Sequence, residues 1–239
     1  MPVAVVTGAS RGIGLELVRH LLMRGFVVHA GCRRPGQAGE LTELIAASGR
    51  GSVLALDVAD PASIRAAAAT LAGNAAAVHL LINNAGIGRP AGVDPAAAEG
   101  PLAALHGDAM TEVLRVNSIG PALVTQALAP MLHRATPDAQ VLNVTSDLGS
   151  VTRPVTAGSY AYAMSKAALN MLTRKLAVEL RPHVTVIAMH PGSVRTRLGG
   201  PSADLAPADA ARGMLDVLDR ITTTDAGHAL THTGQHLPW

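Results

Sequence analysis

The stretch TGASRGIG, residues 7–14, joins an apolar run to a segment of helical period. VAVVT (3–7) has the β-branched composition of a buried strand, and IGLELVRHLLMR (13–24) repeats its apolar residues at helical spacing. Gly12 and Gly14 would let the backbone approach an anion at the start of that helix, where free N–H groups favour phosphate. The stretch therefore predicts a dinucleotide-binding turn. Its spacing differs from G-x-G-x-x-G, so a glycine-rich turn without a ligand is the alternative.

The rest of the chain continues the alternation of strand and helix. Strands are expected at 26–31, 52–56, 78–83, 140–145, 184–189 and near 228–231, and helices at 38–49, 61–73, about 107–133, about 158–180 and near 207–221. Continuous apolar strands between helices indicate a parallel sheet covered on both faces. No linker or repeat divides the chain. We predict one doubly wound Rossmann-type α/β domain over residues 1–239, with about seven strands.

Composition sets limits on location and partners. The chain has 239 residues, 49% hydrophobic but 2% aromatic, so Ala, Val, Leu and Ile must form the core. Charged residues make up 15%, against the roughly 25% of soluble domains. Such a surface leaves room for a homo-oligomer, a dimer or tetramer, although small side chains explain it equally well. A net charge of +2 without a Lys/Arg cluster argues against nucleic acid.

The cysteine and histidine content argues against a disulfide-bonded protein and against a metal site. Cys32 is the single cysteine, so no intrachain disulfide can form. The ten histidines lack metal-ligand spacing, and no metal is expected. Neither a signal peptide nor a membrane span is evident. The expectation is a soluble cytoplasmic protein.

The chain's two tyrosines lie together in SYAYAMSK, residues 159–166. Tyr162 and Lys166 are four residues apart and would stack on one face of a helix, whereas Tyr160 projects about 120° away. A phenol ionises near pH 10, and an adjacent ammonium favours its ionised form. Tyr162 is therefore the candidate general acid/base, and the alternative is a tyrosine packed on a lysine stem. Tyr160 is either a wall of the substrate pocket or packing at the helix start.

Four motifs in order resemble the short-chain dehydrogenase/reductase family over essentially the whole chain. They are TGASRGIG (7–14), NNAG (83–86), YAMSK (162–166) and HPGSVRT (190–196). The segments NSIGPALVTQALAPML, KAALNMLTRKLAVEL and TGQHLPW are similar to the branch that contains sniffer-type carbonyl reductases and C-factor-like proteins.

The resemblance implies a catalytic set of Asn117, Ser146, Tyr162 and Lys166. Tyr162 would exchange the proton, Lys166 would lower its pKa and bind the nicotinamide ribose, and Ser146 would orient the reacting oxygen. The backbone carbonyl of Asn117 would hold a relay water. Ser146 could instead only form a turn at the strand end, and Thr145, the rival hydroxyl, should face the other side of the sheet.

The implied cofactor contacts extend over the four motifs and the ends of two strands. They are Gly8, Ser10, Arg11, Gly12, Ile13, Gly14, Arg33, Asp57, Val58, Asn84, Ala85, Gly86, Tyr162, Lys166, Pro191, Gly192, Val194 and Thr196. Residues 193–207 have the Gly and Pro content of a substrate lid, and an inert surface loop is the alternative.

Pro121 gives a separate reason to single out Asn117. Proline has no N–H, so the carbonyl four residues earlier loses its usual helical partner. Gly120 and Pro121 should also kink the helix, and the alternative is that the helix breaks there.

The charges near the second strand predict NADP as the cofactor. An NAD site usually has a carboxylate at the end of that strand, but none occurs between Glu16 and Glu40. Arg33 and Arg34 follow the strand, and Arg11 lies in the glycine loop. A guanidinium can bind the 2′-phosphate of NADP with paired hydrogen bonds. Alternatively, these arginines are solvated loop charges.

The predicted function is NADP(H)-dependent transfer of a hydride between nicotinamide and the carbonyl or secondary alcohol of a small molecule. Ser193 stands where the branch often has tryptophan, Arg197 where an acid is frequent, and the interval from Ser146 to Tyr162 is longer than usual. These departures leave the substrate open. The alternatives are an NADP-binding regulatory protein with incidental reductase activity, or a dehydratase or isomerase on the same scaffold.

Overall fold

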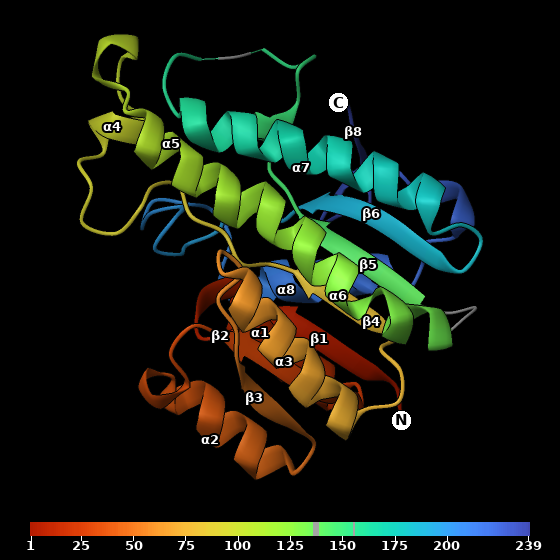
Figure 1. Ribbon diagram of the computed structural model, residues 1–239. Coiled ribbons are helices and arrows are strands. Elements are labelled where there is room, and N and C mark those ends of the chain that lie inside the picture. The colour runs from red at the N-terminus through yellow and green to blue at the C-terminus, as the bar shows by residue number, and fades with distance from the viewer. Residues whose placement is uncertain (136–138, 155) are drawn as a thin grey trace.

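The computed structural model describes residues 1–135, 139–154 and 156–239. Within them the strands form one sheet in the order β3-β2-β1-β4-β5-β6-β7-β8 (Figure 1). Their bounds are β1 Val3–Thr7, β2 Val27–Cys32, β3 Gly51–Ala55, β4 Leu80–Asn83, β5 Ala139–Val144, β6 Val184–His190, β7 Ala229–Thr231 and β8 His236–Leu237. Neighbouring strands of this described sheet are parallel except β7 and β8, which are antiparallel.

Helices cover both faces of the sheet (Figure 1). Their bounds are α1 Gly12–Met23, α2 Gly39–Ser48, α3 Pro61–Asn74, α4 Ala96–Glu99, α5 Gly107–Leu114, α6 Gly120–Arg134, α7 Tyr160–Glu179 and α8 Pro207–Leu218. One apolar core lies under α1, α2 and α8, and the other under α3, α6 and α7. No described helix is long and apolar enough to cross a membrane.

The sheet order reverses at β1, which pairs with β2 on one side and β4 on the other. In a doubly wound sheet a crevice opens at this point, outside the carboxyl ends of the strands. The glycine loop leaves β1 there, and NNAG ends β4 beside it. The topology therefore brings the first two motifs together.

The predicted Rossmann-type fold is confirmed, with one more strand than the expected seven or so. The additional strand is β8, which pairs Leu237 with Ala229 and His236 with Leu230. Two residues are too few to create a period-2 pattern, so the sequence carried no signal for this hairpin.

The long helical pattern near 107–133 forms α5 and α6, joined by a π-helical turn over Arg115–Ile119, labelled η3. Gly120 N–H donates to the carbonyl of Arg115, five residues earlier. The wider turn accommodates Pro121 without ending the helix (Figure 1). The alternative of a helix that breaks at Gly120 and Pro121 is therefore wrong.

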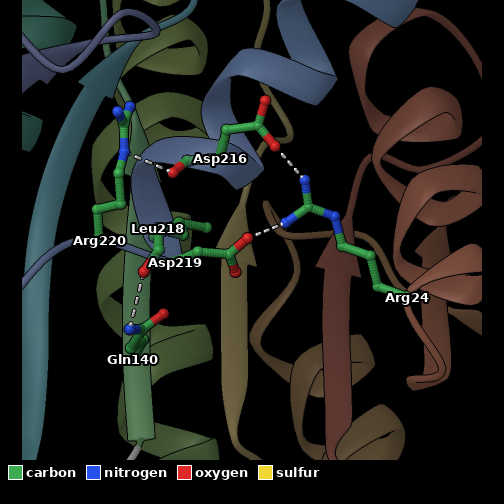
Figure 2. Close-up of polar contacts among 6 residues, drawn as sticks. All are labelled: Arg24, Gln140, Asp216, Leu218, Asp219 and Arg220. Carbon is green, nitrogen blue, oxygen red and sulfur yellow. Dashed lines mark hydrogen bonds and ion pairs between the residues drawn. The ribbon is translucent and has the colours of Figure 1, made fainter.

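Polar contacts fasten α8 across the amino ends of the strands (Figure 2). The Arg24 guanidinium, just after α1, forms ion pairs of 2.5 Å with Asp216 and with Asp219. Gln140 Nε2 on β5 donates to the carbonyl of Leu218 at 3.3 Å. Partly exposed ion pairs contribute little to stability. Their effect is to fix the C-terminal end of α8 at the ends of the strands opposite the glycine loop.

Candidate active site

The start of α1 is built to receive an anion. Arg11 is the N-cap in extended conformation (φ −169°), and no described side chain caps the helix. Its first turn has no acidic residue. The first N–H groups of a helix have no intrahelical acceptor, which here concerns Gly12, Ile13 and Gly14. These groups fit the pyrophosphate of a dinucleotide.

The glycine loop is packed too closely for side chains. A Cβ on Gly14 would lie 2.5 Å from Asn84 Nδ2 and closer still to the carbonyl oxygen of Gly8. Asn84 Nδ2 donates to the carbonyls of Thr7, at 2.9 Å, and Gly8, at 3.1 Å. Position 14 therefore requires glycine, because the glycine loop and the loop after β4 approach each other closely there. Asn84 holds the glycine loop in place.

Thr7 is a supporting residue that the sequence analysis missed. Its hydroxyl oxygen accepts from the backbone N–H groups of Asn84 and Ala85, both at 3.0 Å, and its hydroxyl donates to the carbonyl of Ile82. The side chain therefore joins the end of β1 to the end of β4. The signal in the sequence that could have identified this role is the threonine hydroxyl at the end of the first strand.

Two arginines lie free at the predicted adenosine end of the crevice. Arg11 and Arg33 are exposed, and neither side chain forms a hydrogen bond or ion pair with any residue that the structure describes. Arg34 differs, because its Nη1 donates to Gln37 Oε1 at 3.5 Å. An unpaired guanidinium is available to an anionic ligand. Arg33 and Arg11 therefore fit a phosphate better than Arg34.

Asp57 and Val58 follow β3. Asp57 Oδ1 accepts from the backbone N–H of Ala59 at 3.0 Å, so one carboxylate oxygen already stabilises its own turn. Val58 is 6% exposed, and its carbonyl oxygen lies 2.7 Å from where a Cβ on Gly120 would stand. The turn after β3 therefore packs against the start of α6.

Tyr162 and Lys166 lie one turn apart on α7, as predicted. Lys166 Nζ is 5.5 Å from the centre of the Tyr162 ring and donates to the carbonyl of Val144 at 2.7 Å. Lys166 is 4% exposed. Tyr160 is the first residue of α7, and in the described part of the chain its hydroxyl has no hydrogen-bond partner.

Burial dominates the pKa of Tyr162 in this structure, and the lowering by Lys166 stays a prediction. Burial raises the pKa of Tyr162 to about 12; a hydrogen bond with Ser146 opposes this rise, and the charge of Asp147 adds to it. Burial also lowers the pKa of Lys166 to about 8. Desolvation disfavours the charged form of both groups, and the ammonium hydrogen-bonds the Val144 carbonyl. Tyr162 is therefore a protonated phenol at neutral pH.

Ser146 lies just beyond β5 as the N-cap of a short 3₁₀ helix, η4, Asp147–Gly149. Its Oγ accepts from Leu148 N–H at 3.2 Å and donates to Asp147 Oδ1 at 3.1 Å. Ser146 thus does form a turn at the strand end, and it also faces Tyr162. The rival hydroxyl of Thr145 is buried and donates to Asn170 Oδ1 at 2.6 Å.

Asn117 is fully buried in the π-helical turn η3. Its Oδ1 accepts from Ile87 N–H at 2.9 Å, and its Nδ2 donates to the Ile87 carbonyl at 2.8 Å and to Ser165 Oγ at 3.0 Å. Ser165 Oγ donates in turn to the carbonyl of Tyr162 at 2.7 Å. The side chain of Asn117 thus links the loop after β4 to α7, a role that sequence reasoning missed.

Gly86 completes this part of the crevice. A Cβ there would lie 3.4 Å from Asn117 Oδ1 and 3.7 Å from Lys166 Nζ. Ser10, in the glycine loop, is partly buried at the same edge of the sheet. The NNAG motif therefore connects the glycine loop to the tyrosine and lysine.

The segment after β6 folds back over the glycine loop. Pro191 is buried, and Val194, 4% exposed, forms an isolated bridge with Leu205. Thr196 Cγ2 lies 3.3 Å from where a Cβ on Gly12 would stand. A Cβ on Gly192 would lie 2.6 Å from Leu205 Cδ1. The base of the 193–207 segment is thus ordered across the crevice.

Arg195 was not singled out from the sequence. Its Nη1 donates to the carbonyls of Ala203, at 3.1 Å, and Asp204, at 2.5 Å. These bonds close the 193–207 segment on itself. Ser193 and Arg197 are exposed on it.

The fold and the assembled motifs define a dinucleotide-binding oxidoreductase. The family model described as short chain dehydrogenase matches residues 2–204. The chain belongs to this family and is an enzyme of the short-chain dehydrogenase/reductase class.

Individual relatives agree with the predicted branch. The chain is 40% identical to "C-signal" of Myxococcus xanthus over 168 residues, which cover 68% of this chain and 93% of that one. The solved NADPH-bound carbonyl reductase from chicken fatty liver is 36% identical, with a TM-score of 0.90 and full coverage of both chains. Carbonyl reductase Sniffer of D. melanogaster is 28% identical, with a TM-score of 0.91 and coverage of 100% and 99%. The resemblance to this branch is confirmed.

Proposed function

We propose that the protein is an NADP(H)-dependent oxidoreductase that interconverts a small-molecule carbonyl compound and its secondary alcohol. The observation that carries the proposal is the position of the Tyr162 phenol, one helical turn from Lys166, whose Nζ lies 5.5 Å from the ring centre, and facing Ser146. Two solved neighbours support the choice of substrate class, because both are carbonyl reductases. The NADPH bound to the chicken protein supports the choice of cofactor.

The residues of the crevice fit this cofactor. The uncapped N–H groups of Gly12 to Gly14 would hold the pyrophosphate, and Arg33 with Arg11 would hold the 2′-phosphate. Further contacts are assigned to Gly8, Ser10, Asp57, Val58, Asn84, Ala85, Gly86, Pro191, Gly192, Val194 and Thr196, with Lys166 on the nicotinamide ribose. When bound, the nicotinamide supplies or accepts the hydride.

The chain's own residues handle the proton and the reacting oxygen. In reduction, the Tyr162 hydroxyl, which is protonated at neutral pH, donates its proton to the carbonyl oxygen. Ser146 donates a hydrogen bond to the same oxygen. The backbone carbonyl of Asn117 supports the supply of a replacement proton through water, since Pro121 has no N–H to occupy that carbonyl. Residues 193–207 cover the site as a lid.

NADPH absorbance, followed across a panel of aldehydes, ketones and quinones, tests this function. We expect consumption of NADPH with at least one class of carbonyl compound and formation of the corresponding alcohol. Tight binding of NADPH without turnover of any compound would contradict the proposal. Product formation without net loss of NADPH would instead support a dehydratase or isomerase.

The likeness to "C-signal" favours a second candidate, a cofactor-binding signalling protein. The complete Asn117, Ser146, Tyr162 and Lys166 set argues for catalysis. Absence of turnover across the panel is the result that would favour the second candidate.

We also infer that the chain forms a homo-oligomer. Met164, Met171 and Val178 are spaced seven residues apart on α7 and are 49%, 54% and 72% exposed. Large exposed apolar side chains on one helix face support subunit contact. Light scattering after gel filtration tests this inference, and a monomer at micromolar concentration contradicts it.

A further inference from the structure

Asp147 lies directly after Ser146, at the reacting end of the site. Its Oδ1 accepts the Ser146 hydroxyl at 3.1 Å. Asp147 is partly exposed and is the first residue of η4. The carboxylate is therefore next to the hydroxyl proposed to hold the substrate oxygen.

The bond between Ser146 and Asp147 occupies the only hydrogen of the serine. A hydroxyl has one donor hydrogen, and a bond to a carboxylate is about twice as strong as one to a neutral oxygen. A substrate carbonyl must therefore compete with Asp147 for the Ser146 hydrogen. Leu148 N–H fills one acceptor position of Oγ but supplies no hydrogen to the substrate.

No cation neutralises this carboxylate in the described part of the chain. Asp147 forms no ion pair there, and its Oδ2 accepts no hydrogen bond. The charge of Asp147 acts to raise the pKa of two facing groups, Tyr162 on α7 and His190 at the end of β6. The charge of Arg153 acts in the opposite direction and lowers the pKa of His190. Asp147 is thus free to accept a hydrogen bond from a ligand.

We propose that Asp147 is a specificity-determining residue that selects carbonyl substrates carrying a hydroxyl or protonated amine on the carbon next to the carbonyl. This inference rests on the proposed function, because Ser146 must bind the reacting oxygen. The neighbouring donor binds Asp147 and takes the place of the Ser146 hydroxyl, which then turns to the carbonyl oxygen. In an α-hydroxy ketone the two oxygens are three bonds apart, so both can contact Ser146 and Asp147 together.

Two ketones that differ only in the donor test the proposal. 2-Hydroxyacetophenone has the hydroxyl, and 2-methoxyacetophenone replaces its hydrogen with a methyl group. We expect kcat/KM with NADPH to be about tenfold to a hundredfold higher for the hydroxy compound, the range that one charge-assisted hydrogen bond produces. Asp147→Leu should bring the ratio to about one, and Asp147→Asn should give an intermediate ratio.

Asp108→Asn is the matched control, since it removes an exposed carboxylate at the start of α5 that makes no hydrogen bond to Ser146 among the described residues. Its ratio should equal that of the unmodified protein. Equal kcat/KM for both ketones in the unmodified protein, or an unchanged ratio in Asp147→Leu, overturns the inference while the proposed function stands.

A further measurement covers the case in which neither ketone is reduced. Calorimetric Kd values for the two ketones, measured with NADP bound, then decide the specificity independently of turnover. Tighter binding of the hydroxy compound that disappears in Asp147→Leu supports Asp147 as the acceptor. Equal Kd values in the unmodified protein overturn it.

Discussion

Burial acts in opposite directions on the two principal residues of the site. It raises the pKa of Tyr162 to about 12 and lowers that of Lys166 to about 8, in each case by disfavouring the charged form. The phenol therefore stays protonated at neutral pH, as it would at its ordinary pKa near 10. The ammonium is retained in a buried position by its bond to the Val144 carbonyl.

The lowered pKa of Lys166 predicts a stability that rises with pH. In the unfolded chain lysine titrates near pH 10.5, so between about pH 8 and 10.5 the unfolded state binds more protons than the folded state. The free energy of unfolding should therefore increase by about 2 kcal/mol from pH 7 to pH 10, relative to Lys166→Met. Denaturant unfolding at several pH values measures this difference. A difference that does not vary with pH would contradict the buried ammonium.

Arg33 should determine the choice of cofactor. A guanidinium bonded to the 2′-phosphate contributes one or two charge-assisted hydrogen bonds, so kcat/KM should favour NADPH over NADH by about tenfold to a thousandfold. Arg33→Asp should erode or invert that preference by repelling the phosphate. Arg65→Asp, an exposed position on α3, is the control and should leave it unchanged. Comparable efficiency with both cofactors in the unmodified protein refutes the assignment.

At the scale of elements, the turn η3 places Asn117 where three elements meet. Its i→i+5 geometry follows from Pro121, which cannot donate to the Asn117 carbonyl, and from Gly120, where a side chain would meet Val58. The loss of the α-helical donor to the Asn117 carbonyl could be predicted from the sequence, because Pro121 has no N–H. The π-helical form could not, because it depends on packing between α6 and the turn after β3.

Pro121→Ala should return an N–H to the Asn117 carbonyl. We expect η3 to shift toward α-helical hydrogen bonding and kcat to fall, with little change in the Kd of NADPH, because Pro121 is not among the assigned cofactor contacts. A crystal structure and steady-state kinetics would measure both effects. Unchanged kcat together with an intact π-helical turn is the contrary outcome.

For the whole molecule, the order of motifs predicted most of the fold and where the site lies. Strand–helix alternation identified the parallel sheet, and the strand ends located the glycine loop, NNAG and Ser146. Contacts between residues distant in the sequence could not be predicted in this way. One such contact is the bond from the backbone N–H of Asn84 to the Thr7 hydroxyl oxygen, between residues 77 positions apart. Likewise, desolvation of Tyr162 depends on every element around it.

A buried polar network connects the sheet to one helix layer. Asn83 Nδ2 donates to Asn143 Oδ1 at 2.9 Å and to Thr125 Oγ1 at 3.2 Å, and Asn143 Nδ2 donates to Thr173 Oγ1 at 2.9 Å. These bonds join β4 and β5 to α6 and α7. Buried amides are stabilising only when they are paired.

Asn143→Ala should lower the free energy of unfolding by about 2–4 kcal/mol, through two lost hydrogen bonds and a cavity. Asn74→Ala, which removes an exposed asparagine bonded to the Thr70 carbonyl, is the control and should cost under about 1 kcal/mol. Urea unfolding compares the two variants. Equal losses of stability in the two variants would contradict the claim that the buried network stabilises the fold.

The central claim is that Tyr162, and not Tyr160, exchanges the proton with the substrate oxygen. Turnover and NADPH affinity of Tyr162→Phe and Tyr160→Phe, measured side by side on a carbonyl compound that the unmodified protein reduces, test it most directly. We predict that Tyr162→Phe loses at least about a hundredfold in kcat, in line with the loss of general acid catalysis, while its Kd for NADPH is retained. Tyr160→Phe should keep substantial activity. An active Tyr162→Phe beside an inactive Tyr160→Phe would contradict the assignment.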